Sequence, residues 1–427
     1  MQSFSLEYGS GHVTFSLDET RILGVLTGHD VPLVKDIRAH LWEALEHPCQ
    51  AAPLRETIHP HERVALIVSD MSRFWMRQDL VVPHVIDYLT GVCGTAPGDI
   101  TIIIANGTHV PGSEQDLRTL VTDAVFDRIR VVNHDCLADD LVTLGTTPHG
   151  TVVRIHPDVA HADHVLALGA VTQHVMAGYG GGRKSILPGV SGLDTIQHNH
   201  AFALDPLAFR SNPLIGNAVT DGNPLNEDMC EAAGMVRDLF LINLIMNPDM
   251  KLCRILAGDR MESWKAACME MDAMYQVPVP EKADVVIASC GGYPKDMSLY
   301  QGTKTIDNVE PCLKKGGTLI LLIEARDGGG PAEYFDWIGP LQDGSFEKKL
   351  RENFTIPGYI FLLNCEQAQR YRIMMLTSIA GETVAPMGLE AYQDMDTLLR
   401  HADLEGKSVY VIPNGSTVNP VVKGEKP

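Results

Sequence analysis

The sequence predicts an α/β protein with two α/β domains built on parallel-rich sheets. Short apolar runs suited to buried parallel strands, such as 64–69 (VALIVS) and 101–105 (TIIIA), alternate with segments of helical spacing. Strands that alternate with helices form parallel sheets, whose ligands bind beyond the carboxyl ends of the strands. Polar segments follow these runs directly, as SDMSR at 69–73 and NGTH at 106–109 do. At 427 residues, the chain is long enough for two large domains.

The first half of the chain repeats a strand and helix pattern after a short β-like opening over residues 4–26. Hydrophobic spacing predicts strands at 64–69, 101–105, 131–133, 164–168 and 239–246, and helices at 31–47, 81–92 and 114–129. The carboxyl ends of neighbouring parallel strands meet at one edge of a sheet. Five polar residues fall at such ends, and we expect them to converge there: Asp70, Arg73, His109, His174 and Lys184.

A segment with two prolines, VPVPEK at 277–282, is typical of a domain boundary. We therefore expect an N-terminal α/β domain over residues 1–276 and a C-terminal α/β domain over residues 277–427. Apolar runs predict the strands of the second domain at 284–289, 318–323, 359–363, 373–376 and 408–412.

Composition and charge exclude several classes of protein. Hydrophobic residues make up 45% of the chain and charged residues 21%, as in globular proteins with ample core material. The net charge of −20 and the lack of a basic run argue against a nucleic-acid partner. Nine scattered cysteines without a CxxC pair indicate neither a zinc cluster nor a disulfide framework. With no signal segment and no apolar stretch as long as a membrane span, we expect a cytoplasmic protein without membrane contact.

The stretch 174–200, HVMAGYGGGRKSILPGVSGLDTIQHNH, combines glycines, a lysine and three histidines. Glycines such as Gly181 and Gly182 let a ligand approach the backbone closely. Lys184 can act as a covalent anchor when desolvated, as a phosphate-binding lysine or as a plain surface lysine. A Walker phosphate loop is not matched, because Arg183 stands where its last glycine would be. We favour a functional role for Lys184.

Histidines in this part of the chain indicate acid–base or metal chemistry. His109 and His174 follow apolar runs closely enough to share a cleft, where two imidazoles suit a reaction that alternates acid and base, as racemisation does. His200 can ligate a metal, while His198 points to a different helical face, so one ion would not take both. The alternative for each histidine is a capping or core role.

Two smaller groups of residues suit substrate binding. Arg73 offers a bidentate grip on a carboxylate, although a local ion pair with Asp70 explains the two residues equally well. In the stretch 300–304, Tyr300 and Lys304 have the spacing that places them on one helical face, which would aim a hydroxyl and a cation at one ligand. The alternative is an amphipathic surface helix.

Taken together, these pieces resemble the nickel-pincer-nucleotide-dependent lactate racemase family, which comprises 2-hydroxy-acid racemases and epimerases, along nearly the full length of the chain. The resemblance rests on the order and spacing of SDMSR at 69–73, NGTH at 106–109, QHVMAGYGGGRKSILPG at 173–189, NH at 199–200, GNPLNED at 222–228 and GGYPKDMSLYQGTK at 291–304. It implies an N-terminal cofactor-binding domain and a C-terminal domain that closes over the substrate, with the active site in the interdomain cleft. The implied cofactor is a nickel pincer nucleotide, a pyridinium-3,5-bisthiocarboxylic acid mononucleotide that holds nickel.

The resemblance also implies roles for individual residues. Lys184 would be bonded to the cofactor, His200 would ligate nickel, and His109 and His174 would be the paired acid and base. Further cofactor contacts are implied for Asp70, Ser72, Gly181, Gly182 and Arg183, and substrate contacts for Arg73, Tyr300, Gln301 and Lys304. The enzymes that make the cofactor would be partners of this chain.

The implied reaction is inversion of C2 of a 2-hydroxy acid by reversible hydride transfer. One histidine removes the hydroxyl proton while the C2 hydrogen leaves as hydride, which then returns to the opposite face. The chain departs from the family pattern at Ser72 and Phe74, where the family commonly has threonine and proline, and Trp75 adds further bulk. Tyr359 and Phe361 are candidates for a substrate-side aromatic.

Three other functions are compatible with parts of the sequence. The first is C2 epimerisation of a sugar acid such as gluconate. The second is a catalytically silent protein that binds nickel or a nucleotide, which the presence of both His109 and His174 disfavours. The third is an ordinary nicotinamide-dependent dehydrogenase, which is disfavoured because no GxGxxG follows the first strand.

Overall fold

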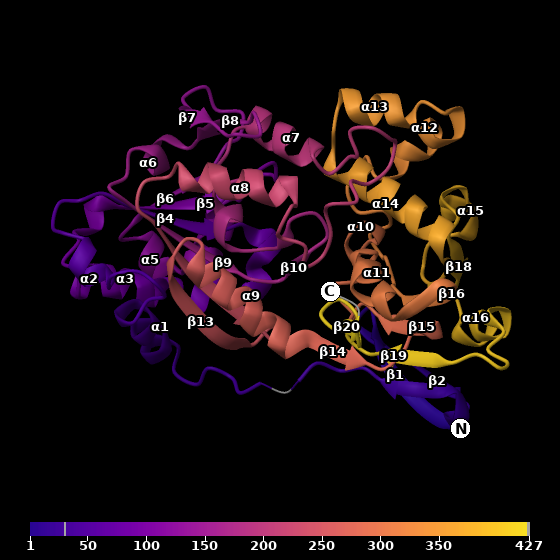
Figure 1. Ribbon diagram of the computed structural model, residues 1–427. Coiled ribbons are helices and arrows are strands. Elements are labelled where there is room, and N and C mark those ends of the chain that lie inside the picture. The colour runs from indigo at the N-terminus through magenta and orange to yellow at the C-terminus, as the bar shows by residue number, and fades with distance from the viewer. Residues whose placement is uncertain (30, 425–427) are drawn as a thin grey trace. The chain divides into compact units, whose positions relative to one another are not determined.

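The computed structural model describes residues 1–29 and 31–424, and the chain divides into two compact units (Figure 1). Unit 1 consists of Met1–His29, Ala201–Asn217 and Ala273–Pro427, and unit 2 of Asp30–His200 and Ala218–Asp272. Each unit contains a six-stranded sheet in which most neighbours are parallel. The α/β class with parallel-rich sheets, predicted from the sequence, is confirmed.

The sheet of unit 2 places its strands in the order β13-β12-β9-β4-β5-β6. These strands are β13 (Leu252–Asp259), β12 (Leu239–Met246), β9 (His164–Ala170), β4 (Val64–Ser69), β5 (Ile100–Ala105) and β6 (Arg130–Asn133). All neighbours are parallel except β12 and β13. Because Val64 pairs with both Ile100 and His164, the carboxyl ends of β4, β5 and β9 lie at one edge. The predicted strands of this half are therefore confirmed.

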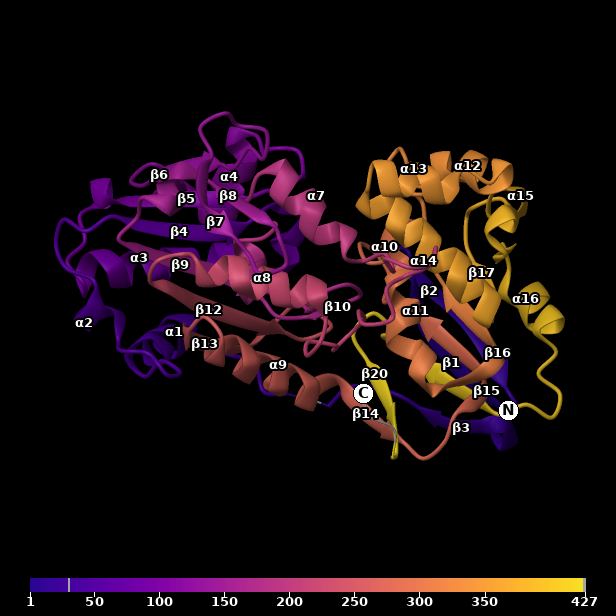
Figure 2. The same cartoon turned by 45° about the horizontal axis from the view of Figure 1, so that its top comes forward.

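Helices cover both faces of this sheet. Alternate residues such as Leu66, Ile102 and Leu166 are fully buried on one face, in a core shared with α1 (Ile37–Glu46), α3 (Val82–Gly91) and α4 (Glu114–Val121). Figures 1 and 2 show α8 (Pro224–Gly234) and α9 (Glu262–Tyr275) beside each other in front of the sheet. Burying one leucine side chain stabilises the fold by roughly 1.5–3 kcal/mol, so this core fixes the sheet firmly.

The sheet of unit 1 is parallel throughout, in the order β18-β17-β16-β15-β19-β3. These strands are β18 (Glu390–Tyr392), β17 (Arg372–Leu376), β16 (Leu313–Leu322), β15 (Ala283–Ser289), β19 (Val409–Ile412) and β3 (Ile22–Val25). An antiparallel hairpin of β1 (Gln2–Tyr8) and β2 (Gly11–Leu17) contributes Phe4 and Phe15 to its core.

Further helices and short strands complete both units. The remaining helices are α2 (Leu54–Thr57), α5 (Asp123–Phe126), α6 (Pro157–Ala160), α7 (Leu193–Ala201), α10 (Leu299–Gly302), α11 (Lys304–Val309), α12 (Ile338–Asp343), α13 (Phe346–Glu352), α14 (Ile356–Arg370), α15 (Gly381–Val384) and α16 (Met395–Ala402). The remaining strands form three pairs: β7 (Val142–Thr146) with β8 (Val152–Ile155), β10 (Gln173–His174) with β11 (Gly178–Tyr179), and β14 (Gln276–Val279) with β20 (Asn419–Val422).

The units differ from the single boundary expected between residues 276 and 277. The first 29 residues belong with the C-terminal part of the chain, because β3 pairs with β19 at the edge of the unit 1 sheet. The proline-containing segment at 277–282 includes part of β14, which pairs with β20 inside unit 1. Pairing between strands far apart in sequence leaves no local pattern, so no stretch of the sequence indicates that residues 1–29 join this unit.

One predicted strand is wrong. Residues 359–363 lie in α14, whose start is capped by Thr355: its hydroxyl accepts a hydrogen bond from the backbone N–H of Gly358 at 3.2 Å. Pro357 occupies the first turn, where its missing N–H costs nothing. The apolar run looked like a strand because α14 is buried along most of its length, and short apolar runs do not distinguish the two structures.

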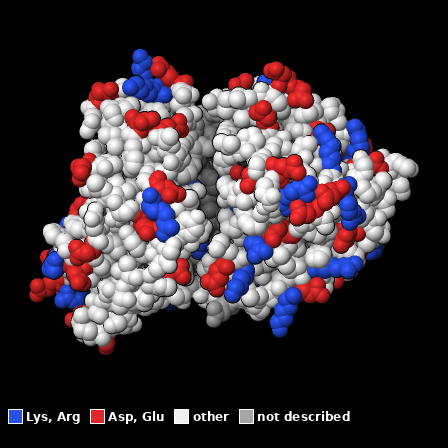
Figure 3. All heavy atoms as spheres, turned by 180° about the vertical axis from the view of Figure 1, so that it is seen from behind, with Lys and Arg blue, Asp and Glu red and all other residues white. Residues whose placement is uncertain are grey.

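The surface carries charges of both signs. On the face shown in Figure 3, acidic and basic side chains are interspersed within each unit, so this face has no extended basic area of the kind that binds a nucleic-acid backbone. Among the described residues, no helix is both long enough and apolar enough to cross a membrane.

Candidate active site

Asp70 and His109 form a hydrogen-bonded pair at the carboxyl edge of the unit 2 sheet. Asp70 directly follows β4, and His109 follows the neighbouring strand β5, so the sheet brings the two together. Nδ1 of His109 lies 2.7 Å from Oδ2 of Asp70. An ionised carboxylate can only accept a hydrogen bond, so Nδ1 carries the proton and Nε2 keeps its lone pair. This tautomer makes His109 a base at Nε2.

Ser72 and Arg73 complete the surroundings of the Asp70 carboxylate. The hydroxyl of Ser72 donates to Oδ1 of Asp70 at 2.8 Å, and Nη1 of Arg73 lies 3.5 Å from the same oxygen. Burial alone would raise the pKa of Asp70, but the hydrogen bond from His109 and the charge of Arg73 outweigh it and lower the pKa below its ordinary value. Asp70 is therefore ionised at neutral pH, as the tautomer of His109 requires.

The ion pair of Asp70 and Arg73, one of the two alternatives from the sequence, is present in the structure. The side chain of Arg73 is nevertheless 45% exposed, so part of its guanidinium faces solvent and keeps donors for a ligand. Its role in binding a carboxylate stays a prediction. A direct contact of Asp70 and Ser72 with the cofactor likewise stays a prediction, because the structure engages both side chains with His109 and Arg73.

His174 and Lys184 form a second pair, with Nζ of Lys184 3.0 Å from Nε2 of His174. Nδ1 of His174 accepts the backbone N–H groups of Met176 and Ala177, both at 3.2 Å. A neutral imidazole whose Nδ1 accepts carries its proton on Nε2. The amine of Lys184 thus lies against the imidazole of His174, directly after the glycine-rich loop.

Arg183 holds the glycine-rich loop between these two residues from the inside. Its side chain is fully buried, and it donates to the carbonyls of Ala177 at 2.6 Å and Tyr179 at 2.8 Å and to Oδ1 of Asn226 at 2.9 Å. The guanidinium also lies over the ring of Trp264, 3.9 Å from its centroid. Burial lowers the pKa of Arg183 to about 10, which still leaves it charged at neutral pH. Its cofactor-binding role, implied by the resemblance, can thus only act through the shape of the loop.

Gly181 and Gly182 have backbone conformations that disfavour any other residue. Both have positive φ, +67° and +53°. A Cβ on Gly181 would lie 3.0 Å from the carbonyl oxygen of Ala170, and one on Gly182 would lie 2.8 Å from the Trp264 ring. The glycines therefore let the loop fold tightly over β9, to which Ala170 belongs, before Lys184 follows.

His200, on α7, has the protonation state of a metal ligand. Nδ1 lies 2.9 Å from the carbonyl oxygen of Ile196, which can only accept, so Nδ1 carries the proton and Nε2 has the lone pair. Burial, and then the neighbouring Lys184, lower the pKa of His200 to about 3, so the ring is neutral at neutral pH. Nδ1 of His198 contacts Oγ1 of Thr151 at 2.8 Å. That the two histidines do not share an ion stays a prediction.

Tyr300, Gln301 and Lys304 lie together in unit 1, as their spacing predicted. Nζ of Lys304 donates to Oε1 of Gln301 at 2.9 Å and lies 4.4 Å from the centroid of the Tyr300 ring. A cation over an aromatic face is attracted by the ring, so the shared helical face is confirmed. Their contact with substrate stays a prediction.

The segment 324–330 braces the residues before this group. The backbone N–H groups of Leu299 and Tyr300 donate to the carbonyls of Gly328 and Gly329 at 3.0 and 3.1 Å. A Cβ on Gly330 would lie 2.8 Å from Oγ of Ser298, so the two segments approach too closely for a side chain there. The glycines of EARDGGG thus serve to position Tyr300.

The aromatic residues suspected of shaping the substrate pocket pack internally. Tyr359 and Phe361 are 1% and 0% exposed, and the ring of Phe361 contacts Tyr334 and Phe346. Their candidacy as substrate-side aromatics gains no support from this internal packing and stays a prediction. Phe74 and Trp75 also pack against the hydrophobic core of unit 2.

Two features of the site were missed in the sequence. The sequence predicted that Asp70 and His109 converge at the sheet edge, but not that they form a hydrogen bond with each other. The buried carboxylate of Asp228 accepts hydrogen bonds from three side chains near α7, although its motif, GNPLNED at 222–228, was recognised without a role.

Comparison with known proteins assigns the chain to a family. A family profile described as the lactate racemase N-terminal domain matches residues 8–210, and one described as the lactate racemase C-terminal domain matches residues 279–419. The chain belongs to the lactate racemase family. As a member of this family it is an isomerase, a racemase.

Curated members of the lactate racemase family match most of the chain. The lactate racemase of Thermoanaerobacterium thermosaccharolyticum is 28% identical over 346 residues, which cover 80% of this chain and 79% of that protein. The lactate racemase of Lactiplantibacillus plantarum is 28% identical over 348 residues, which cover 80% of each protein.

Solved structures extend the comparison to the fold. The structure of the lactate racemase apoprotein from Thermoanaerobacterium thermosaccharolyticum has a TM-score of 0.88 at 26% identity and covers 99% of this chain and 100% of that chain. A protein from Thermotoga maritima, at a TM-score of 0.63 and 14% identity, covers 93% of this chain and 100% of its own and shares the fold.

We predict that Arg183→Lys destabilises this racemase through the glycine-rich loop. A lysine lacks the several coplanar N–H donors of a guanidinium, so carbonyls that now accept from Arg183 would be buried without a donor. This should lower the free energy of unfolding by about 2–3 kcal/mol. Thermal unfolding should show a melting temperature lowered by several degrees. The matched control is Arg210→Lys, because Arg210 is 58% exposed and its ion pair with Asp205 contributes little. Equal melting temperatures for the two variants would contradict the structural role of Arg183.

Proposed function

We propose that this racemase inverts C2 of a 2-hydroxy carboxylic acid, with a nickel pincer nucleotide bound covalently to Lys184. The observation that carries the proposal is the complementary protonation of two histidines at one sheet edge. His109 has a lone pair on Nε2 because Asp70 takes the proton of Nδ1, and His174 has a proton on Nε2 because Nδ1 accepts from the backbone. Inversion needs one acid and one base that exchange roles, and this pair provides them.

The residues present fit the proposed cofactor. Lys184 offers the primary amine that a covalent anchor needs, and His200 offers a neutral imidazole with its Nε2 lone pair, a common ligand of nickel. Their proximity is supported by the effect of Lys184 on the pKa of His200, which is lowered first by burial and then by Lys184. When bound, such a cofactor supplies an acceptor for the C2 hydrogen as hydride.

The protein's own part is proton transfer and orientation. His109 would take the hydroxyl proton of one enantiomer at Nε2, with Asp70 stabilising the imidazolium that forms. His174, in its imidazolium form, would return a proton from Nε2 when the opposite enantiomer forms, and it would be left as the neutral imidazole. For the reverse direction the two exchange roles, which requires both to be present.

The substrate-holding groups that we propose are Arg73 in unit 2 and Gln301 and Lys304 in unit 1, with Tyr300 beside them. Arg73 and Lys304 are cations that can bind the carboxylate of a 2-hydroxy acid, and the amide of Gln301 can form a hydrogen bond with the hydroxyl of the same substrate. The names of the curated relatives make lactate the first substrate to test.

The substrate and the hydride route are tested together in deuterated water. Protein produced with the cofactor-making enzymes is incubated with single enantiomers of lactate, malate and gluconate, and the stereochemistry and deuterium content at C2 are followed. We expect lactate to racemise with its C2 hydrogen retained, because a hydride does not exchange with solvent. Extensive deuterium uptake at C2 would show proton abstraction instead and would overturn the hydride route.

The covalent anchor is tested by intact-mass spectrometry. Protein produced with the cofactor-making enzymes should be heavier than the sequence mass, and Lys184→Ala should return it to the sequence mass because the bonding amine is lost. Lys265→Ala is the matched control, since Lys265 is an exposed lysine of the same unit and should keep the added mass. An active protein with no added mass would refute the anchor.

The paired histidines are tested by His109→Gln and His174→Gln. Each variant should lose about 10²–10⁴-fold in the rate of racemisation in both directions, because either direction needs both an acid and a base. Nickel content should stay unchanged, since neither residue is the proposed ligand. His161→Gln, at an exposed position of the same unit, should retain full activity. Full activity in either test variant would remove that histidine from the mechanism.

A further inference from the structure

The carboxylate of Asp228 is the centre of a buried hydrogen-bond network next to α7. Asp228 is 0% exposed and comes from α8. Its Oδ1 accepts from the hydroxyl of Thr147 at 2.5 Å, and its Oδ2 accepts from the hydroxyl of Thr151 and from Nδ2 of Asn199, both at 2.8 Å. A buried carboxylate is expensive unless donors satisfy it, and here three side chains do.

The network fixes the residues that directly precede His200. Asn199 binds Asp228 and also donates from Nδ2 to the carbonyl of Leu225 at 3.0 Å. Because the hydroxyl of Thr151 donates to Asp228, it accepts the proton of Nδ1 of His198, 2.8 Å away. Two successive side chains of α7 are thus tied, directly or through one hydroxyl, to the same carboxylate. The end of this helix can neither slide nor rotate without breaking these bonds.

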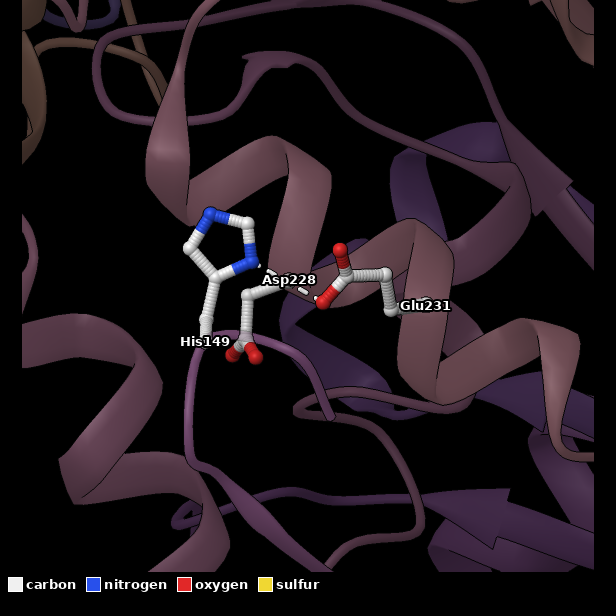
Figure 4. Close-up of side chains that lie close together, drawn as sticks. All are labelled: His149, Asp228 and Glu231. Atoms are coloured by element: carbon white, nitrogen blue, oxygen red, sulfur yellow. Dashed lines mark hydrogen bonds and ion pairs between the residues drawn. The ribbon is translucent and has the colours of Figure 1, made fainter. Parts of the chain in front are cut away.

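A metal-binding role for Asp228 is the competing explanation. One ligand atom each of His149, Asp228 and Glu231 lies within 4.8 Å of the others, a spacing that an ion could bridge. Figure 4 shows Nδ1 of His149 facing Glu231, at 2.9 Å, while the carboxylate of Asp228 is turned away from the imidazole. Because both Asp228 oxygens already accept from threonine or asparagine, the network accounts for Asp228 without an ion.

We propose that Asp228 is a positioning residue for His200: its carboxylate holds Asn199 directly and His198 through Thr151, and so fixes the end of α7 from which His200 presents its imidazole Nε2 for nickel. The proposal rests on the proposed function, in which His200 is the nickel ligand. Groups that orient a metal ligand commonly contribute 10–100-fold to metal affinity.

The test compares Asp228→Asn with Glu231→Gln in protein produced with the cofactor-making enzymes. Both changes convert a carboxylate to an amide on α8, three residues apart, but only the first removes the acceptor from the network. The readouts are the imidazole contribution to nickel K-edge X-ray absorption and the rate of nickel loss to a chelator. We expect Asp228→Asn to reduce the imidazole contribution and to release nickel roughly 10–100-fold faster. Glu231→Gln should match the unchanged protein.

A third variant separates this proposal from the proposed function. His200→Ala should abolish the imidazole contribution; if it does not, His200 is not the ligand, and the proposed function fails at that point. If His200→Ala abolishes the signal and Asp228→Asn leaves it and the release rate unchanged, positioning by Asp228 is refuted. Equal nickel loss in Glu231→Gln and Asp228→Asn would favour the metal cluster instead.

Thr151→Val keeps the test decisive should Asp228→Asn fail to fold. Valine has the shape of threonine and leaves the carboxylate in place, but it removes the hydroxyl that links His198 to Asp228. We expect nickel release to accelerate several-fold, with circular dichroism unchanged. A release rate equal to that of the unchanged protein would contradict the network's role.

Discussion

The rest of the candidate site depends on the hydrogen bonds that the buried guanidinium of Arg183 donates to the glycine-rich loop. Within residues 1–29 and 31–424, no carboxylate pairs with the guanidinium; main-chain carbonyls of the loop that it closes, Asn226 and the face of Trp264 satisfy it instead. Since a charged group buried in this way tolerates little movement, the loop has essentially one shape. That shape places Lys184 within hydrogen-bonding distance of His174 and leads the chain onward to α7.

The chemistry of the site is determined by which ring nitrogen of each histidine is engaged by the protein. A carboxylate engages Nδ1 of His109, two backbone N–H groups engage Nδ1 of His174, and a carbonyl engages Nδ1 of His200. The first and third therefore present a lone pair at Nε2, and the second presents a proton. Three identical side chains thus differ in what they present at Nε2, and of the neighbours that cause this difference only Asp70 is charged.

Local patterns predicted the parts of the fold and site that depend on local residues, and failed where distant ones decide. The strands of unit 2 and the convergence of Asp70 and His109 followed from apolar runs and the polar segments after them. The helix over 359–363 was missed because its apolar run is too short to show a period, although Thr355 and Pro357 marked its start. The partner of β3 and the donors to Asp228 come from far along the chain, so no window of sequence contained them.

The edge pairing of β3 with β19 implies an order of events on the ribosome. Unit 2 has all of its residues once Asp272 has been synthesised, so its core can form early, as N-terminal units generally do. Unit 1 begins with the first residues of the chain but lacks the neighbour of β3 until residues 409–412 emerge. During that interval β3 has no partner strand, which exposes the nascent protein to the errors of pairing that long-range parallel sheets invite.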